Sequence, residues 1–455
     1  MTDSLPAAVQ KAQRFPLSLT QEWFLGMDKG DDVGSFGSRF IQTRAVRVTG
    51  PVDLAVLQGA LDDVVARHEM LRSTIVRDAD PPYQLVFPPC QVPLEVRDMP
   101  PAPGKSVEEA IEELIYTPEP ISARGVPLIR GRLWRFSDRD SVLFVIVHHI
   151  VSDAWSLEVI MRDLGACYAA RATGAPVALP PVREYREFAE WQRANATSTA
   201  ADGAPAYWRD KLRGAREFTV PNDHGHPDKY SNPYSLHTFG IEADIMAGAA
   251  ALATAARTTV FTVLLSAFYV HVHEMTGVTD LALRALTAGR EQERFHDTVG
   301  VFLNSLPLRT DLADCSSFRD IVEHARDTFF DAIAHEMPIN MLERTFPDYI
   351  KSREDLGTSE WTISYAASQL GEDLIYPIAE GAREQVVRWR EEDALRDIPS
   401  GVVWGLHMPP GGDLLGGILF NVDELDESTV AGWVAAVRRI LASAVRDPDQ
   451  DWKTL

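Results

Sequence analysis

The sequence predicts a two-lobed protein of mixed α/β structure (α+β), and three observations support this prediction. The chain has 455 residues, 45% of them hydrophobic. A chain of this length usually folds around more than one hydrophobic core. Apolar residues recur at helical and at strand spacing in both halves. A polar segment rich in turn formers, Pro221–Pro233, separates the halves. We therefore expect an N-terminal lobe over 1–220, a linker over 221–235 and a C-terminal lobe over 236–455.

The N-terminal half mixes amphipathic helices with strand-like apolar runs. Asp53–Leu71 has apolar residues at helical spacing and begins at an aspartate suited to cap a helix. Another helix is expected to begin at Ser152 or Asp153 and to end near Ala170. The other expected helices are Val107–Ile115, Tyr185–Ala194 and Ala206–Leu212. The expected strands are Arg72–Arg77, Tyr83–Phe87, Leu128–Phe136 and Ser141–His149.

The same alternation of elements begins again after the turn-rich segment. The expected helices are Ile245–Arg257, Phe261–Thr276, Phe318–His335 and Ser428–Val445. The expected strands are Leu281–Thr287, Val301–Leu308, Trp361–Tyr365, Val402–Met408 and Leu414–Val422. Two lobes of similar size account for this repetition most simply.

The composition narrows the classes of partner and location. A formal net charge of −22 argues against binding to nucleic acid or to an anionic membrane surface. No run approaches the roughly 18 to 20 apolar residues of a membrane span, and the N-terminal sequence lacks the pattern of a secretory signal. Three cysteines, odd in number and far apart, suggest a reducing compartment without a disulfide framework. We expect a cytoplasmic protein with no nucleic-acid or membrane partner.

The stretch from His148 to Ser156 (HHIVSDAWS) carries most of the candidate chemistry. Two histidines follow the continuous apolar run Val142–Val147, and Asp153 comes four residues after His149. Histidine is the default proton-transfer side chain, because its pKa is close to neutrality. Successive strand side chains face opposite sides of a sheet, so if both histidines lie on the strand, at most one enters a site. The apolar run does not alternate, so spacing leaves open which one that is, and also leaves open a purely structural pair.

No metal site is expected. Adjacent histidines on a strand diverge, and no third ligand stands at a metal-binding spacing. His271 and His273 are two residues apart on the helix they are expected to occupy, so they do not share a face. His335-Glu336 lacks the second histidine of a zincin motif.

Asp153 has two interpretations. It could orient a histidine as the acid of a catalytic triad, but the GxSxG nucleophile motif is absent from the sequence. It could instead cap the following helix or pair with a buried arginine, and so hold the loop in shape. The structural role is favoured, since aspartates at helix starts are usually caps.

From His148 to Ser156 the sequence resembles the HHxxxDG signature, often followed by xS, of the condensation domains of nonribosomal peptide synthetases. These domains belong to the acyltransferases built like chloramphenicol acetyltransferase. Further segments resemble family motifs in the expected order, over nearly the whole chain. They are Leu17–Glu22 (family S-x-x-Q), Arg67–Ser73 (RHExLRT), Tyr207-Trp208 (YW), Ala288–Arg290 (AGR) and Val299–Arg309 (VGxFxNxLPLR). Each segment is weak alone, but together in this order they are a strong match.

The resemblance implies two chloramphenicol-acetyltransferase-like lobes in a V-shaped pseudo-dimer, with the active site in a tunnel between them. It implies no bound cofactor, because a carrier protein supplies the phosphopantetheine arm that bears the acyl group. His149 is then the active-site histidine. His148, Asp153, Arg72 and Arg290 shape the site, with Asp153 paired to the two arginines. The residues expected to line the tunnel or the substrate are Ala154, Trp155, Ser156, Asn304 and Ser364.

The chain departs from the family pattern at two positions. Ala154 stands where the family has glycine. Its methyl group could narrow the passage for a pantetheine arm, or could be harmless where the backbone is helical. Ser364 stands where many members carry Asn before Tyr, which leaves a substrate role for that position open.

These features indicate a free-standing condensation enzyme that transfers a carrier-tethered acyl or aminoacyl group to an amine or alcohol in natural-product biosynthesis. Leu415–Ile418 (LGGI) lacks the serine to which a carrier domain attaches pantetheine, and no adenylation or thioesterase motif is found. Amide and ester formation both stay open, as do a free small molecule and a second carrier protein as the acceptor.

A function of another class is a catalytically silent module that recruits a tailoring enzyme, since fold alone does not establish function. Two enzymatic alternatives match less well. The segment Ala154-Trp155-Ser156 does not match the VSW-like segment of an epimerisation domain, and the DFGWG motif of a plant-type acyl-CoA transferase is absent.

Overall fold

The chain forms two compact units. The computed structural model describes residues 11–101, 104–107, 109–111, 120–198, 203–225, 234–351, 357–367, 383–386, 401–408 and 412–455. The first unit contains the described parts of 1–194, 288–303 and 369–399, and the second contains those of 195–287, 304–368 and 400–455. Each unit combines β-sheets with helices, which confirms the predicted mixed α/β class.

The units differ from the expected contiguous lobes at three places. Residues 195–220 were expected in the N-terminal lobe but belong to the second unit, and residues 288–303 were expected in the C-terminal lobe but belong to the first. The described residues 383–386 were likewise expected in the C-terminal lobe and belong to the first unit. The second exchange has a physical cause, because the buried side chains of Phe295 and Phe302 pack in the hydrophobic core of the first unit.

The expected linker over 221–235 is shorter at both ends in the structure. Pro221 is the last residue of a strand and Tyr234 is the first residue of another. Between them, the structure describes residues 222–225, and residues 226–233 lie outside the described ranges.

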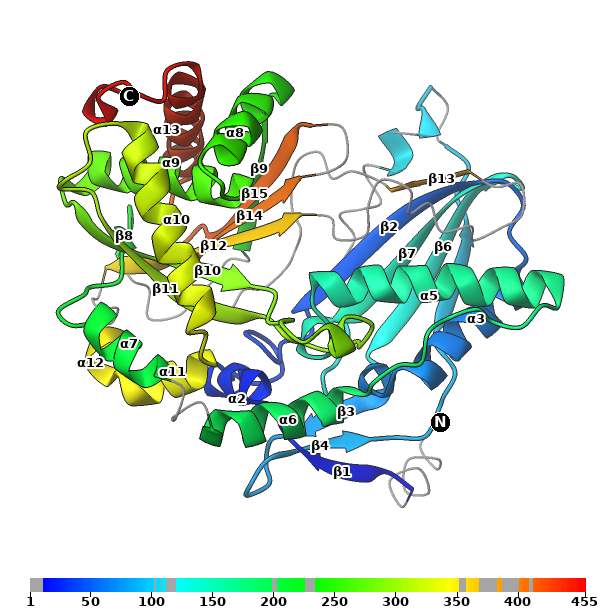
Figure 1. Ribbon diagram of the computed structural model, residues 1–455. Coiled ribbons are helices and arrows are strands. Elements are labelled where there is room, and N and C mark those ends of the chain that lie inside the picture. Colours follow the sequence, from blue (N-terminus) through cyan, green and yellow to red (C-terminus); the bar gives the residue numbers. More distant parts are fainter. Residues whose placement is uncertain are drawn as a thin grey trace. The chain divides into compact units, whose positions relative to one another are not determined.

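A five-stranded sheet forms the centre of the first unit. Its strands, in order across the sheet, are β13 (Arg383–Val386), β2 (Ile41–Thr49), β7 (Asp140–His148), β6 (Ile129–Ser137) and β5 (Leu94–Asp98). β7 pairs antiparallel with β2 and with β6, and its residues Val142–Val147 are all buried. Burial on both faces explains why this run is continuously apolar. Helices α3 (Leu54–Arg67) and α5 (Ala154–Thr173) pack side by side against one face of the sheet (Figure 1).

Smaller elements complete the first unit. They are the three-stranded sheet β1 (Gln13–Pro16), β4 (Tyr83–Val86) and β3 (Ser73–Val76), the helices α2 (Leu19–Gly26) and α6 (Tyr185–Ser198), and the short 3-10 turns η1 (Glu69–Arg72), η2 (His149–Val151) and η4 (Glu293–Phe295). The expected helix Val107–Ile115 lies partly outside the described residues.

The helix expected over Asp53–Leu71 ends earlier than predicted. Asp53 caps α3 by accepting the N–H groups of Ala55 and Val56 at 2.9 and 3.1 Å. His68 is extended, so the helix stops at Arg67 and η1 follows as a separate turn. Apolar spacing alone does not register this break, because the buried residues of η1 continue the same pattern.

A second sheet forms the centre of the second unit. Its strands, in order, are β11 (Asn304–Asp311), β10 (Asp280–Thr287), β12 (Thr358–Ala367), β14 (Val402–Met408), β15 (Leu414–Asn421) and β9 (Tyr234–Ile241), and β8 (Thr219–Pro221) pairs with β12. The helices are α7 (Ala204–Lys211), α8 (Ala243–Ala255), α9 (Val260–Thr276), α10 (Phe318–Ala334), α11 (Ile339–Thr345), α12 (Pro347–Lys351) and α13 (Glu427–Arg446), followed by the short 3-10 turn η5 (Trp452–Thr454).

A helix that crosses a membrane needs about 20 mostly apolar residues. Within the described ranges, no single helix is long and apolar enough to cross a membrane. One bent pair, α8 with α9 at an angle of 106°, meets the length and composition criteria when its two helices are taken together.

Candidate active site

The two histidines lie on different elements. His148 is the last residue of β7, and His149 is the first residue of the turn η2. His148 is fully buried. Its Nδ1 accepts the N–H of Ile150 at 3.2 Å, so its Nε2 carries the proton and donates to the carbonyl of Gly37 at 3.2 Å. Burial lowers the pKa of His148 to about 3. His148 is therefore a neutral side chain held by two hydrogen bonds.

His149 has the opposite tautomer. Its Nδ1 lies 2.7 Å from the carbonyl oxygen of Ser152. A carbonyl oxygen can only accept, so Nδ1 donates and the Nε2 of the neutral ring keeps its lone pair. The half-buried ring stacks on Phe40, with ring centroids 4.7 Å apart and an interplanar angle of 17°, and the ring of Phe24 lies 6.1 Å away. This arrangement fixes the ring with its basic nitrogen at Nε2.

Gln42 is a polar neighbour of His149 that the motif analysis did not include. It lies on β2, where it pairs with Val147 of β7. Its Nε2 lies 3.4 Å from Nε2 of His149, and its Oε1 accepts the hydroxyl of Ser152 at 3.3 Å. In the sequence, Gln42 follows two apolar residues (FIQT). This pattern alone does not indicate a functional residue.

Asp153 is the N-cap of α5 and is buried. Its Oδ1 accepts the N–H of Ser156 at 2.7 Å, and its Oδ2 accepts the N–H of Phe302 at 3.0 Å. An ion pair joins it to Arg290 at 3.0 Å. Among the described residues, its side-chain bonds go to these groups and not to either histidine ring. The carboxylate therefore joins the start of α5 to the segment 288–303.

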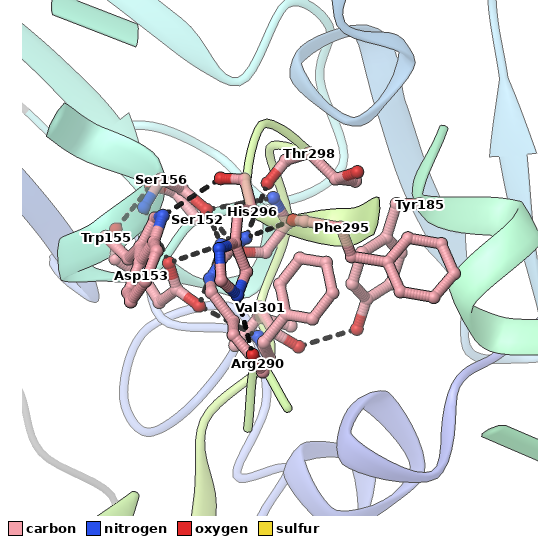
Figure 2. Close-up of polar contacts among 12 residues, drawn as sticks. Ser152, Asp153, Trp155, Ser156, Tyr185, Arg290, Phe295, His296, Thr298 and Val301 are labelled. Carbon is pink, nitrogen blue, oxygen red and sulfur yellow. Dashed lines mark hydrogen bonds and ion pairs between the residues drawn. The ribbon is translucent and has the colours of Figure 1, made fainter. Parts of the chain in front are cut away.

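Arg290 is the centre of this polar cluster (Figure 2). Besides Asp153, it donates to the carbonyls of Phe295 and Thr298 at 2.8 and 2.9 Å and to the hydroxyl of Ser156 at 2.7 Å. Its guanidinium carbon lies 3.8 Å from the centroid of the Phe302 ring. Burial lowers the pKa of Arg290, against the opposite effect of Asp153.

Arg72 does not join Asp153, contrary to the expected pairing. Its guanidinium donates to the carbonyls of Val65 at 3.1 Å, of Phe87, and of Ala66 at 3.5 Å. Arg72 ends the turn η1, directly after α3, and this position directs its N–H groups to the unpaired carbonyls at the end of that helix. Arg290 alone supplies the arginine partner of Asp153 within the described part of the chain.

The three residues after Asp153 differ in exposure. Ala154 is exposed and is the first residue of α5, so its backbone is in an ordinary helical conformation. Ser156 is buried, and its hydroxyl bonds both the carbonyl and the N–H of Gly300, at 2.7 and 3.0 Å. Trp155 donates its indole N–H to the carbonyl of His296 at 2.9 Å. Ser156 and Trp155 therefore hold the segment 288–303, and the expectation that Ser156 lines a substrate passage does not fit its burial.

The opening S-x-x-Q motif has a structural meaning. Ser18 and Gln21 form a capping box at the start of α2, with bonds of 3.0 and 2.8 Å in the two directions. The Ser18 hydroxyl also lies 2.7 Å from the hydroxyl of Tyr185, which donates to the carbonyl of Val301 at 2.6 Å. Tyr185, which the motif analysis did not single out, thus connects this helix start to the segment 288–303.

The glycines of the later motifs allow close approaches within the first unit. Gly289 has φ +60°, and a Cβ there would lie 2.0 Å from the carbonyl oxygen of Phe302. A Cβ on Gly300 would lie 2.0 Å from the ring of Tyr185. Both motif segments therefore need glycine to fold the loop between β10 and β11 into its observed shape.

Asn304 and Ser364 belong to the second unit. The amide of Asn304 donates to Oε1 of Glu336 and to the carbonyl of Met337, and accepts the N–H of Ile339, each at 2.8 Å. Its polar atoms join β11 to the start of α11, and its contact with substrate stays a prediction. Ser364 is half-buried on β12.

A mixed α/β chain with a histidine pair at the end of a central strand and an Asp–Arg pair behind it has the features of the chloramphenicol-acetyltransferase-like class. The Condensation domain family matches residues 11–455. The chain belongs to this family.

Three relatives illustrate the range of similar proteins. The crystal structure of SgcC5 from Streptomyces globisporus, in complex with (R)-(-)-1-(2-naphthyl)-1,2-ethanediol and sucrose, shares 33% identity at a TM-score of 0.86, covering 96% of this chain and 100% of that one. The chondramide synthase cmdD of Chondromyces crocatus is 29% identical over 97% of this chain. This chain spans 11% of that synthase. The X-domain from teicoplanin biosynthesis has a similar fold, with 22% identity and a TM-score of 0.79 over 97% of both chains, and its complex with OxyB also matches.

Proposed function

We propose that this protein transfers an acyl or aminoacyl group from the phosphopantetheine thioester of a carrier protein to an amine or hydroxyl acceptor, with His149 as the group that handles the proton. The observation that carries the proposal is the tautomer of His149. Its Nδ1–H is bound by the Ser152 carbonyl at 2.7 Å, which leaves a basic Nε2 in the family's active-site position. A cytoplasmic location is part of this proposal.

The reaction needs one proton to move twice. The acceptor N–H or O–H hydrogen-bonds to Nε2 of His149, and the acceptor atom attacks the thioester carbonyl as Nε2 takes its proton. The tetrahedral intermediate then collapses, the C–S bond breaks, and the pantetheine thiolate takes the proton back from Nε2. The Ser152 carbonyl stabilises the imidazolium that exists between these steps, because it accepts the hydrogen bond of Nδ1–H throughout.

An alcohol is the acceptor that we favour. The solved protein at 33% identity contains an aromatic 1,2-diol, and its chain is covered along 100% of its length. This likeness supports an ester-forming enzyme that meets its carrier protein through weak, transient contacts.

The proposal is tested with N-acetylcysteamine thioesters as mimics of the loaded pantetheine arm. A panel of aryl-1,2-ethanediols and the matching amino alcohols serves as acceptors, and mass spectrometry detects the ester or amide. His149→Ala is expected to lose about 10²–10⁴-fold in turnover, the usual contribution of a general acid–base. His224→Ala, which alters an exposed histidine of the second unit, is the matched control and should keep wild-type turnover. Wild-type turnover in His149→Ala would contradict the mechanism.

A catalytically silent recruiting module is the second candidate, and the X-domain relative that was solved in complex with OxyB is the observation in its favour. The proton-transfer geometry at His149 supports the enzyme instead. A folded wild-type protein that transfers no acyl group and binds a tailoring oxygenase stably in a pull-down would establish the second candidate.

A further inference from the structure

His149 is one corner of a closed set of three hydrogen bonds. Its Nδ1–H donates to the backbone carbonyl of Ser152 at 2.7 Å. The hydroxyl of Ser152 donates to Oε1 of Gln42 at 3.3 Å. The side-chain Nε2 of Gln42 lies 3.4 Å from Nε2 of His149. The last contact is a donation from the amide to the ring, since Nε2 of the neutral ring has a lone pair and no proton.

The direction of each bond follows from the one before it. The Ser152 carbonyl requires a proton on Nδ1, so Nε2 has a lone pair and the amide of Gln42 must present its NH₂ group to it. Oε1 of Gln42 then faces the Ser152 hydroxyl, which also lies 3.3 Å from the carbonyl of Asp153. Reversing the ring tautomer would leave Nδ1 facing a carbonyl without a proton and Nε2–H facing the NH₂ group of Gln42. The arrangement therefore admits one tautomer.

The aromatic neighbours of the His149 ring do not determine its tautomer, so polar contacts must do so. Phe40 stacks on one side of the ring and Phe24 lies near it, and neither can choose between the ring nitrogens. His148, the adjacent titratable group, has its own bonds to Ile150 and Gly37 and is neutral near pH 7. The carboxylate of Asp153 is engaged with Arg290 and with backbone N–H groups.

We propose that Gln42 is a positioning residue for the acyl transfer, which supports the Nδ1–H tautomer set by the Ser152 carbonyl and keeps the place beside Nε2 of His149 that the acceptor N–H or O–H takes. This inference rests on the proposed function. Gln42 is 6% exposed and is fixed by its pairing on β2, so its amide has little freedom to turn away. Its bond to Nε2 is longer than the usual range, so an acceptor with a better donor displaces it at small cost.

The position of Gln42 also affects when His149 is charged. An N–H group that donates to Nε2 stabilises the neutral ring and opposes its protonation. Replacing that donor by a carboxylate reverses the effect, because a carboxylate accepts from Nε2–H of the imidazolium. Gln42→Glu should therefore raise the pKa of His149, and Gln42→Met, which removes the donor without adding charge, should raise it by less.

The experiment uses the full chain with ¹⁵N-labelled histidine, followed by NMR across a pH titration, with the His149 signals assigned by their loss in His149→Ala. In the wild-type protein at high pH we expect a protonated Nδ1 and an unprotonated Nε2. In Gln42→Met the Nε2 signal should shift as it loses the amide donor and the titration midpoint of His149 should move up slightly, whereas in Gln42→Glu the midpoint should move up by about one pH unit or more. Thr43→Val, one residue along the same strand, is the control and should leave these signals unchanged.

Transfer kinetics provide the second readout. In Gln42→Met, kcat should fall by about tenfold with an unchanged KM for the thioester, because the change affects the proton acceptor and not the binding of the donor. The acid limb of the pH–rate profile should move up in Gln42→Glu. An Nε2–H tautomer in the wild-type protein, or unchanged signals in Gln42→Met, would overturn the inference. NMR reports the tautomer whether or not the protein transfers acyl groups, so a failure of the proposed function is seen separately in the activity of His149→Ala.

Discussion

Each unit of the molecule contains a buried arginine paired with carboxylate, and the two sites differ in what they hold. In the first unit, Arg290 pairs with Asp153 at 3.0 Å and bonds three loop and helix-start groups. In the second, Arg284 of β10 pairs with Glu217 at 2.7 Å and with Glu360 of β12 at 3.1 Å. The first pair organises irregular backbone, whereas the second lies between strands.

The electrostatic balance of the two arginines differs accordingly. Burial lowers the pKa of Arg290, and the single carboxylate of Asp153 does not offset it. Burial acts on Arg284 in the same direction, but the carboxylates of Glu217 and Glu360 outweigh it and raise its pKa overall. A buried cation with one carboxylate depends on backbone carbonyls for the rest of its compensation. Arg290 has two such carbonyls, both in the segment 288–303.

The same type of ion pair therefore serves two purposes in this protein. Around Arg284 it stabilises a sheet whose shape strand pairing already determines. Around Arg290 it determines the shape itself, because the segment 288–303 has little regular structure beyond the turn η4. The carboxylate of Asp153 is also the N-cap of α5, one residue after Ser152. A change there reaches the hydrogen bond that holds His149, and a change at Glu217 lies in the other unit.

The largest expected effect comes from Asp153→Ala. This substitution leaves the buried Arg290 without its carboxylate and removes the acceptor of the Ser156 and Phe302 N–H groups, so the free energy of unfolding should fall by about 3–5 kcal/mol. The Ser152 carbonyl should also lose its exact placement, which lowers kcat of the remaining folded protein by about tenfold or more. Urea denaturation and single-temperature kinetics measure the two effects.

Glu217→Ala is the matched variant that tests the comparison. It removes one of the two carboxylates of Arg284 while Glu360 stays at 3.1 Å, so a smaller loss of stability is expected, about 1–3 kcal/mol. Its kcat should stay at the wild-type value at temperatures where the variant is folded. If Asp153→Ala and Glu217→Ala lower stability equally and neither changes kcat, the distinction between a site-shaping and a sheet-stabilising pair is wrong.

A smaller effect is expected at Glu184, a carboxylate of the first unit that lies near the carboxylate of Glu69 and accepts the backbone N–H of that residue at 3.1 Å. Burial, followed by the charge of Glu69, raises the pKa of Glu184 to about 7. The unfolded chain loses this proton near pH 4.5. The folded state therefore binds more protons between these values, and stability falls as the pH rises from about 4.5 to about 7. Glu184→Gln removes this loss and should stabilise the protein at about pH 8 by about 1–3 kcal/mol.

The pH dependence of stability provides a control for Glu184→Gln. Near pH 4, Glu184 is protonated in both states, so Glu184→Gln and the parent should have similar urea midpoints. An equal gain at pH 4 and pH 8 would mean that the effect does not arise from the ionisation of Glu184. Asp53→Asn, which alters the cap of α3, is not expected to reproduce this pattern of gain at high pH only.

Local patterns predicted many of the elements, but strands β2, β5 and β9 were not predicted, and some predicted elements have other bounds in the structure. The apolar run of β7 and the cap of α5 at Asp153 are local signals, and both are found in the structure. The strand expected over Val301–Leu308 begins only at Asn304. Its first residues are equally apolar, but Val301 and Phe302 pack in the core of the other unit. Apolar spacing reports burial and does not report which core receives a side chain.

The candidate site shows the same limit. The motif located both histidines and Asp153, but the resemblance implied Arg72 as well as Arg290 as partners of Asp153. Only the fold of 288–303 onto the first unit selects Arg290 and leaves Arg72 with helix carbonyls. The contact of Gln42 with His149 spans 107 positions and depends on the register between β2 and β7, which no single-sequence pattern encodes.

The smallest expected effect comes from Ala154→Gly, which restores the glycine of the family motif. Ala154 is exposed at the first position of α5, where its backbone is helical and its methyl group meets solvent. Glycine loses more backbone entropy than alanine on folding, so the free energy of unfolding should fall by less than about 1 kcal/mol. The urea midpoint checks this value, with Ala243→Gly at the equivalent first position of α8 as the matched control in the other unit. A gain in stability would show that the Ala154 methyl is strained against a neighbour, and a rise in turnover with the thioester mimic would show that this methyl narrows the path of the donor. If neither stability nor turnover rises, alanine in place of the family glycine is neutral at this position, because Asp153 already caps the helix.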